Sequence, residues 1–325
     1  MKCVEVKIIE KSEELPGIAY RNFFHSEDFF RMLEQTPGCT PYMAVAYSKE
    51  GTILAHILAV VYRRGSFLPP YLYSCGRIYG EGEYAPGESK NDLFGEMVEA
   101  LTRRLRRRMC LYIEFSNLSK KMFGYRHLRR HGYFPVRWLQ IHNSLHSKPP
   151  EARISEKTKK RIESAFDAGV ETREASTEEE VQAFHKVLRR YYRFKFQRFI
   201  PRRELFLLLW KSQYCKILLT LSKGRIIGGS ALVYTGKDAY LWYMVSRNKT
   251  HLIQHPRSMT IWHALQHSHE HGFEHLRFMN VGLPFSKNPI RESILRFGGK
   301  PTSTFRWFRF SFGFVNKIVG WFLND

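Results

Sequence analysis

The fold is decided by a pattern that occurs twice, as LRRHGYFPVRW at residues 128–138 and as LRFGGKPTSTFRW at residues 295–307. Each copy begins as a short amphipathic helix, reaches a glycine and continues into residues that suit a β-strand. Glycine commonly follows the last helical residue because it adopts a left-handed conformation without steric penalty. Each copy therefore predicts a short helix closed by a glycine and followed by the last strand of a domain.

The segments that precede the two copies also correspond, and they occur in the same order. Each half has two strand-like runs joined by a glycine turn, which predicts a β-hairpin, and then a helix and a further strand. The corresponding segments are 42–47, Gly51, 53–62 and 111–115 in the first half, and 216–221, Gly224, 226–234 and 276–279 in the second. Internal repetition of this kind predicts one α+β domain used twice in tandem, each copy a mixed twisted sheet flanked by helices.

The repeat sets the expected domain boundaries. We predict a first domain over 1–148, a basic linker helix over 149–168, a second domain over 169–312 and an amphipathic tail over 313–325. Apolar residues in the tail recur at helical spacing, which predicts a helix. A terminal helix packed on the core is favoured over one that lies in a membrane interface.

Composition and charge exclude several classes of protein. The hydrophobic share of 43% excludes a disordered chain, and the five cysteines include no C-x-x-C pair, which argues against a disulfide framework or a zinc cluster. The net charge of +22 predicts an anionic partner. No stretch approaches the ~20 apolar residues of a membrane span, and the charged start does not resemble a signal peptide. We therefore expect a cytoplasmic protein, peripheral at the inner membrane surface if it meets a membrane.

Several segments in this order resemble a known family. They are SEKTKKRIESAFDAGVETRE at 155–174, GRIIGG at 224–229, the strand 240–246, the helix 260–270 and the close at 295–300. Together they resemble tandem domains of the acyl-CoA N-acyltransferase (GNAT) fold, and among these the Fem-type (FemAB-like) peptidyltransferases. The second domain is the one expected to be active.

The resemblance implies an enzyme that moves an acyl or aminoacyl group from a thioester or a tRNA ester to an amine. The expected acceptor is an anionic molecule such as a cell-envelope precursor. The donor would lie where two central strands separate, and a backbone N–H there would stabilise the oxyanion. An acyl-CoA-dependent N-acetyltransferase and a non-catalytic module that binds RNA or an anionic membrane remain as alternatives.

One departure from the family pattern bears on the donor. CoA-dependent members carry a glycine-rich loop whose amides cradle the pyrophosphate at a helix N-terminus. The corresponding QHPRSM at residues 254–259 has no glycine. No tightly bound cofactor is expected, and acyl-CoA or aminoacyl-tRNA would act as a co-substrate.

The resemblance also implies a set of site residues. Tyr243 is the expected general acid or donor-side contact, with packing as the alternative, and Asn280 is expected to orient the amine or to cap a turn. Donor-binding residues are expected to be Met244, Val245, Ser246, Gln254, His255, Arg257, Ser258 and Arg296. Acceptor-binding residues are expected to be Tyr192, Lys195, Arg198, Trp242 and Lys300.

Three further patterns have a structural as well as a functional interpretation. The basic aromatic stretch 189–203 suits a nucleic-acid backbone or a solvated helix end. The arginine run 103–108 suggests a solvated or membrane-facing surface. Histidines at 263, 267, 271 and 275 have the i, i+4 spacing of zinc ligands, but no glutamate follows His263 as a general base and a third ligand is not identified. We therefore expect no metal site.

Overall fold

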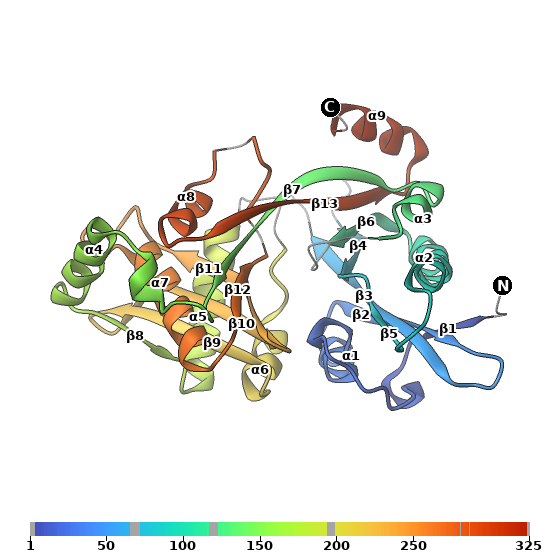
Figure 1. The fold of residues 1–325 in the computed structure, drawn as a ribbon, viewed down its shortest axis with the longest axis horizontal. Coiled ribbons are helices and arrows are strands. Elements are labelled where there is room, and N and C mark those ends of the chain that lie inside the picture. Colours follow the sequence, from blue (N-terminus) through green and yellow to red (C-terminus); the bar gives the residue numbers. More distant parts are fainter. Residues whose placement is uncertain are drawn as a thin grey trace. The chain divides into compact units, whose positions relative to one another are not determined.

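The computed structural model describes residues 4–65, 72–116, 123–193, 199–279, 281–285 and 287–323. The chain forms two compact units, which can be followed in Figure 1. The first unit comprises Met1–Trp138 and Thr304–Asp325, and the second comprises Leu139–Ser303. Each unit is built around its own sheet.

The first unit has the strand order β1-β2-β3-β4-β6-β13. Its elements are β1 (Glu5–Ile9), α1 (Glu27–Glu34), β2 (Cys39–Tyr47), β3 (Ile53–Gly65), β4 (Leu72–Tyr79), β5 (Glu83–Tyr84), α2 (Lys90–Arg107), β6 (Cys110–Ser116), α3 (Tyr125–Arg130), the end of β13 (Lys300–Phe310) and α9 (Gly313–Leu323). The β4–β6 pair is parallel and the other pairs among the described registers are antiparallel. The sheet is therefore mixed, as expected.

The second unit has the strand order β7-β12-β11-β10-β9-β8. Its elements are the end of β7 (Phe134–Ser144), α4 (Glu156–Asp167), β8 (Val170–Glu174), α5 (Glu178–Tyr192), α6 (Arg203–Lys211), β9 (Cys215–Ser222), β10 (Arg225–Thr235), β11 (Asp238–Ser246), α7 (Pro256–Glu270), β12 (His275–Phe278) and α8 (Pro289–Arg296). The β11–β12 pair is parallel, in the same sequence position as β4–β6 of the first unit. The predicted tandem α+β architecture with two mixed sheets is confirmed.

The last strand of each half ends in the sheet of the other unit. Residues 141–144 of β7 pair with β12 of the second unit, and residues 306–310 of β13 pair with β6 of the first. The sequence ranges placed 139–148 in the first domain and 304–312 in the second, whereas the contacts place each segment in the opposite unit. The reason is that a strand takes its place from the partner to which it hydrogen-bonds, and these two strands exchange partners.

Helix α4 also belongs to a unit rather than to a linker between units. Its side chains Ile162 and Ala165 are buried in the core of the second unit, together with residues of α7. The helix begins at the N-cap Ser155, whose side chain accepts a hydrogen bond from the Thr158 N–H.

The second unit's sheet is covered on both faces. Met244 of β11 and Met259 of α7 share one core cluster, so α7 covers that face. On the other face the ring of Tyr243 packs against Phe206 of α6, with centroids 5.3 Å apart. The end of β11, the end of α5 and the start of α7 lie close together.

Candidate functional site

A β-bulge in β11 determines the shape of the site. Ala231 of β10 faces Tyr243, and the next residue, Leu232, faces Leu241, so Trp242 is an extra residue in β11. A bulge reverses which residues face each side of a sheet and bends the strand. The register with β12 runs from Asp238 to Leu241 and ends at the residue before the bulge. The two parallel strands therefore pair only over the first half of β11.

Beyond the bulge, β11 directs polar backbone groups away from β10. The Tyr192 hydroxyl of α5 donates a hydrogen bond of 3.0 Å to the Met244 carbonyl. In an antiparallel pair the N–H and C=O of one residue point to the same side. Since the Met244 carbonyl does not face its β10 partner Ser230, its N–H also points to the side where β12 has ended. An amide in this position is suited to stabilise an oxyanion.

A cavity of about 770 Å³ lies at this end of the second unit. Its lining comes from the end of α5, the end of β11 with the loop 247–250, the start of α7 and the start of α8. We call it the second-unit cavity. Its volume is within the range of small-molecule sites.

The charge of the second-unit cavity is one-sided. Its described lining includes the cations Arg190, Arg247, Lys249 and Arg257 and no carboxylate. The buried Nε of Arg257 has no hydrogen-bond partner, and its Nη1 donates a long 3.4 Å hydrogen bond to the Pro289 carbonyl. An unpaired buried donor is costly unless a ligand satisfies it. The arrangement favours an anionic ligand.

Ser246 supplies a second unsatisfied polar group in the second-unit cavity. It is 3% exposed, lines the cavity, and its hydroxyl has no partner. The hydroxyl of Ser230, on β10, is likewise buried without a partner but does not line the cavity. The two serines thus share an environment and differ in access to a ligand.

The N-terminus of α7 offers little to a pyrophosphate. Its cap, His255, has a left-handed φ of 43°, and Pro256 at the first helical position has no N–H. The next amide, that of Arg257, donates 3.0 Å to the Asn248 side chain. The first two positions of the helix thus offer no free backbone donor, which leaves side-chain cations as the main groups suited to an anion here.

The structure brings together only part of the expected site. Tyr192, Ser246 and Arg257 line the second-unit cavity, and Met244 lies beside them on β11. Trp242 is the bulged residue and is 3% exposed. The other described residues expected in the site do not line this cavity: Tyr243, Val245, Gln254, His255, Ser258, Arg296 and Lys300. Asn280, Lys195 and Arg198 lie outside the described residues.

Tyr243 and Val245 are turned away from the second-unit cavity by the alternation of side chains along β11. Tyr243 is 2% exposed, and its ring packs against α6. This placement favours a packing role. Its function as a general acid stays a prediction that mutation can test.

The structure adds cavity residues that sequence reasoning did not place in the site. Residues 247–250 belong to the loop that joins β11 to α7. Asn288 caps α8 by accepting hydrogen bonds from the N–H groups of Ile290 and Arg291. Arg190 and Tyr191 belong to the basic aromatic stretch, which was noticed as a binding segment. The sequence signal for the loop 247–250 is the polar run SRNKT at residues 246–250, which directly follows an apolar strand.

The equivalent strands of the first unit stay closed. Strand β4 pairs with β6 from Ser74 to Tyr79, and the Gly80 N–H continues the contact by donating to the Ser116 carbonyl. Glu114 is buried between Arg77 at 2.7 Å and Arg306 at 2.8 Å. Burial alone would raise the pKa of Glu114, but the two guanidinium groups hold it below its usual range. The first unit therefore has no strand separation within its described residues.

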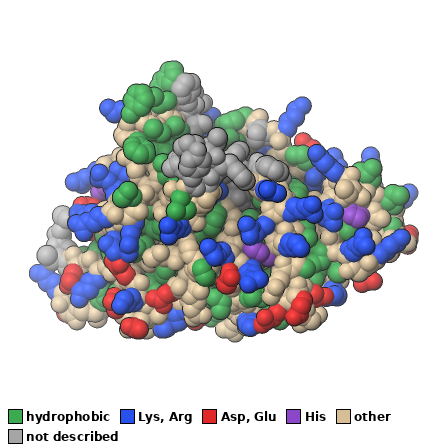
Figure 2. Space-filling model, turned by 180° about the vertical axis from the view of Figure 1, so that it is seen from behind, with side chains coloured by type: hydrophobic (Ala, Val, Ile, Leu, Met, Phe, Trp, Pro, Cys, Tyr) green, Lys and Arg blue, Asp and Glu red, His purple; other side chains and the backbone are tan. Residues whose placement is uncertain are grey.

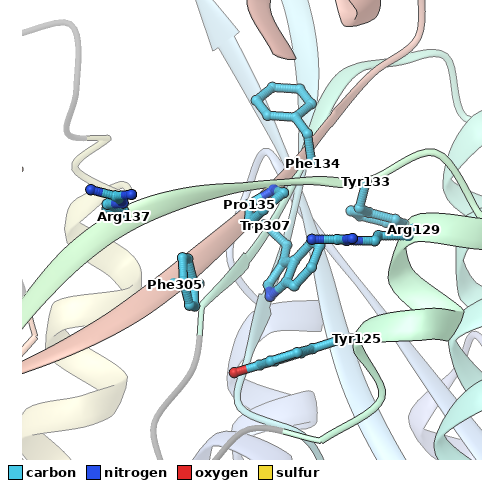
Figure 3. Close-up of a pocket in the computed structure, with 8 residues that line it drawn as sticks. All are labelled: Tyr125, Arg129, Tyr133, Phe134, Pro135, Arg137, Phe305 and Trp307. Carbon is cyan, nitrogen blue, oxygen red and sulfur yellow. The ribbon is translucent and has the colours of Figure 1, made fainter. Parts of the chain in front are cut away.

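The first unit has a separate cavity of about 610 Å³. Figure 3 shows the rings of Tyr125, Phe305 and Trp307 gathered on one side of β7 and β13, with Arg129 beside them and Phe134 pointing to the other side. The Tyr125 ring centroid lies 5.4 Å from that of Trp307 and 6.3 Å from that of Phe305. This cluster is an aromatic surface with a cation at its edge.

The histidine repeat of α7 forms a hydrogen-bond network. The ring of His267 lies 2.7 Å from Glu174 through Nε2 and 2.8 Å from the Tyr234 hydroxyl through Nδ1. The other Glu174 oxygen accepts from Lys216 at 2.9 Å. Burial alone would raise the pKa of Glu174, but the hydrogen bonds from His267 and Lys216 hold it below its usual range. Contacts within the protein thus satisfy the side chains of Glu174 and of His267, which belongs to the histidine repeat considered as a metal site.

Comparisons with known proteins agree with this architecture. A family model described as an acetyltransferase (GNAT) domain matches residues 152–285, which lie in the second unit. Comparison with curated protein sequences finds no match. The solved structure of FemX is similar with a TM-score of 0.59 at 9% identity, over 97% of this chain and 96% of that one.

Two further solved structures show the same fold. A tandem GNAT protein from the clavulanic acid biosynthesis pathway has a TM-score of 0.56 at 10% identity, over 95% of this chain and 99% of that one. The C-terminal domain of a putative lysylphosphatidylglycerol synthetase from Agrobacterium fabrum has a TM-score of 0.55 at 13% identity, over 93% and 91%. At these identities the likeness establishes a shared tandem fold.

Proposed function

We propose that this chain, a tandem GNAT-fold acyltransferase, transfers an acyl or aminoacyl group from a phosphate-bearing donor to an amine, using the second-unit cavity. The acceptor we propose is an anionic molecule such as a cell-envelope precursor. FemX and the lysylphosphatidylglycerol synthetase domain support a Fem-like reaction through their fold.

The observation that carries the proposal is the bulge at Trp242 beside a cationic cavity. The bulge ends the pairing with β12 and leaves the Met244 amide on the unpaired side of β11. The cavity next to it offers Arg257 and Ser246, each with an unsatisfied polar atom. A negatively charged donor can thus be held beside an amide suited to an oxyanion.

The chemistry requires little of the protein because the donor is already activated. The amine nitrogen attacks the donor carbonyl, and the resulting oxyanion accepts a hydrogen bond from the Met244 N–H. The carbonyl then re-forms, and the bond to the thiolate or the ribose oxygen breaks. The proton lost by the amine reaches the leaving group through water, so positioning supplies much of the rate enhancement.

The donor is either a CoA thioester or a tRNA ester, since both carry phosphates. The start of α7 supports the tRNA ester, because Pro256 and the Asn248 cap remove amides that would otherwise cradle a pyrophosphate. A CoA-dependent N-acetyltransferase would have to hold its pyrophosphate with side chains such as Arg257 and Lys249.

Thermal-shift measurements with a donor panel test the proposal. The panel comprises acetyl-CoA, longer acyl-CoAs and aminoacyl-tRNA, and the true donor raises the melting temperature by mass action. Arg257→Gln should remove most of that shift, whereas Arg225→Gln, an exposed change at a hairpin turn, should retain it. A shift with RNA of any sequence and none with an acylated donor would instead support a non-catalytic binding module.

Product formation is the second readout. The donor that shifts the melting temperature should transfer its acyl group to amine-bearing envelope precursors, as detected by mass spectrometry. Binding without transfer to any amine tested would contradict an enzymatic role. For the location in the cell we propose the cytoplasmic side of the inner membrane, which fractionation of cells would test.

A further inference from the structure

The C-terminal helix α9 exposes a continuous apolar face. Phe314 is 76% exposed, Ile318 39% and Trp321 68%, and their spacing places them on one side of the helix. Phe312, just before the helix, is 62% exposed. Packing on the core was the favoured expectation for this helix, but Phe314, Ile318 and Trp321 face solvent.

The opposite side of α9 is firmly attached to the first unit. The Asn316 side chain accepts a hydrogen bond from the Phe310 N–H at 2.8 Å and donates one to the Gly132 carbonyl at 2.9 Å. Gly320 is buried against Phe134. The helix is therefore held in one orientation, and its apolar face is directed outward by these contacts.

Exposed cations lie on the segments next to α9 and on α9 itself. The Ser311 N–H donates to the Leu111 carbonyl at 3.0 Å, which ties the start of α9 to the segment that follows α2, and the Asn316 bond ties it to the end of α3. The ends of α2 and α3 and the outer side of α9 carry five exposed cations, which we call the basic flank: Arg106, Arg107, Arg129, Arg130 and Lys317. None of the five forms an ion pair with another described residue.

Another exposed apolar side chain lies in the same region. Met109, in the turn between α2 and β6, is 83% exposed. Figure 2 shows hydrophobic side chains gathered over α9, with lysine and arginine side chains on the neighbouring surface. An apolar face bordered by unpaired cations is unusual for a surface that meets only water.

We propose that the apolar face of α9 and the basic flank together bind an anionic lipid surface. Aromatic side chains on an amphipathic helix insert at the boundary between headgroups and acyl chains, while arginines and lysines beside it attract anionic headgroups. Within the described residues no helix is long and apolar enough to cross a membrane, so α9 would lie in the interface rather than span it.

Charge complementarity decides between lipid and a second copy of this chain. The protein carries a net charge of +22, and a symmetric dimer through α9 would bring two basic flanks together. Like charges in that arrangement repel each other. An anionic bilayer offers both the opposite charge and an apolar phase for the exposed rings.

Co-sedimentation of the full chain with vesicles tests the proposal. We expect binding to vesicles of phosphatidylcholine with about one third phosphatidylglycerol, and little binding to phosphatidylcholine alone. The double variant Phe314→Ser/Trp321→Ser should weaken binding at least about tenfold, because two inserted rings are lost. The matched control Phe166→Ser, on an exposed apolar residue of α4 in the second unit, should bind as the unmodified chain does.

The basic flank has its own test. Arg106→Gln/Arg107→Gln should weaken binding about thirtyfold, at roughly fivefold per cation near an anionic surface. Lys223→Gln/Arg225→Gln removes the same charge from a hairpin turn of the second unit and should leave binding nearly unchanged. Added salt should reduce binding to the anionic vesicles.

The outcomes separate lipid from the other occupants and from the proposed reaction. Equal binding of the α9 variant and the unmodified chain would overturn the proposal, as would self-association through α9 in light scattering without vesicle binding. Because the assay needs no donor, a failed vesicle result leaves acyl transfer to a soluble amine untouched, and failed transfer leaves vesicle binding untouched.

Discussion

Replacing Ser246 by alanine should change stability and donor binding in opposite directions. The side chain is 3% exposed, and its hydroxyl has no partner in the structure. An unsatisfied buried hydroxyl costs about 1–3 kcal/mol of folding free energy, so Ser246→Ala should recover up to that amount. At about 2–4 °C per kcal/mol for a unit of this size, the melting temperature should rise by roughly 2–12 °C.

The same substitution should weaken donor binding, because Ser246 lines the second-unit cavity. A neutral hydrogen bond contributes about 0.5–1.5 kcal/mol, which corresponds to roughly a two- to twelvefold loss of affinity. Stability is measured by thermal unfolding without ligand, and affinity by titration with the donor that the panel identifies.

Ser230→Ala provides the matched control. Its hydroxyl is equally buried and unpaired, but it does not line the cavity. It should raise the melting temperature similarly while leaving donor affinity unchanged. The reasoning fails if Ser246→Ala lowers the melting temperature, or if both variants affect the donor alike.

Further predictions concern the proton donor, the first-unit ion cluster and acid stability. Tyr243→Phe should lower kcat with little change in donor affinity if the phenol donates a proton; unchanged kcat would assign Tyr243 to packing. Glu114→Gln should lower the melting temperature by roughly 6–20 °C, because Arg77 and Arg306 lose their counter-charge at a cost of about 3–5 kcal/mol. The control Glu156→Gln, at an exposed position, should hardly change the melting temperature. Burial lowers the pKa of His25 to about 3 and that of His56 to about 4, so below pH 6.5 the unfolded chain binds more protons than the folded one. The free energy of unfolding should therefore decrease as the pH is lowered, by about 1.4 kcal/mol per pH unit for each histidine. A urea midpoint that stays constant between pH 7 and 5 would contradict this.

The repeat predicted the fold because it depends on local signals. Glycine closures such as Gly132 and hairpin turns such as Gly51 act through backbone conformation, and both glycines have positive φ in the structure. The exchange of β7 and β13 could not be predicted in this way. Both strands follow the same helix-glycine pattern, and the pattern specifies a strand without specifying its partner.

The bulge in β11 could not be predicted from the sequence, for a related reason. Strand β11 reads DAYLWYMVS, and all its residues after Asp238 are buried. A strand covered on both faces shows no alternation of polar and apolar residues, so a slip of one residue at Trp242 leaves no trace in the sequence. The shifted register turns Met244 and Ser246 to the face of α7 and Tyr243 to the face of α6, which the sequence could not predict.

The two copies of the domain differ at the pair of strands on which the proposed reaction depends. In the second unit the bulge lies in the middle of β11, and the pairing with β12 stops there. In the first unit the irregularity lies near the start of the β4–β6 pair, and pairing resumes to Ser116. The β3–β4 pair, which corresponds to β10–β11, has no register shift among its printed partners, so the bulge at Trp242 distinguishes the second unit from the first.

This difference implies a division of labour after duplication. The first unit, in which the strands stay paired, has Glu114 between two arginines, whereas the second unit has the Met244 amide beside a cavity. The first unit also carries α9 and the basic flank, which we propose to bind an anionic lipid surface rather than the donor. The net charge of +22 would then serve two proposed anion-binding surfaces, the second-unit cavity and the basic flank, and variants in one should leave the function of the other intact.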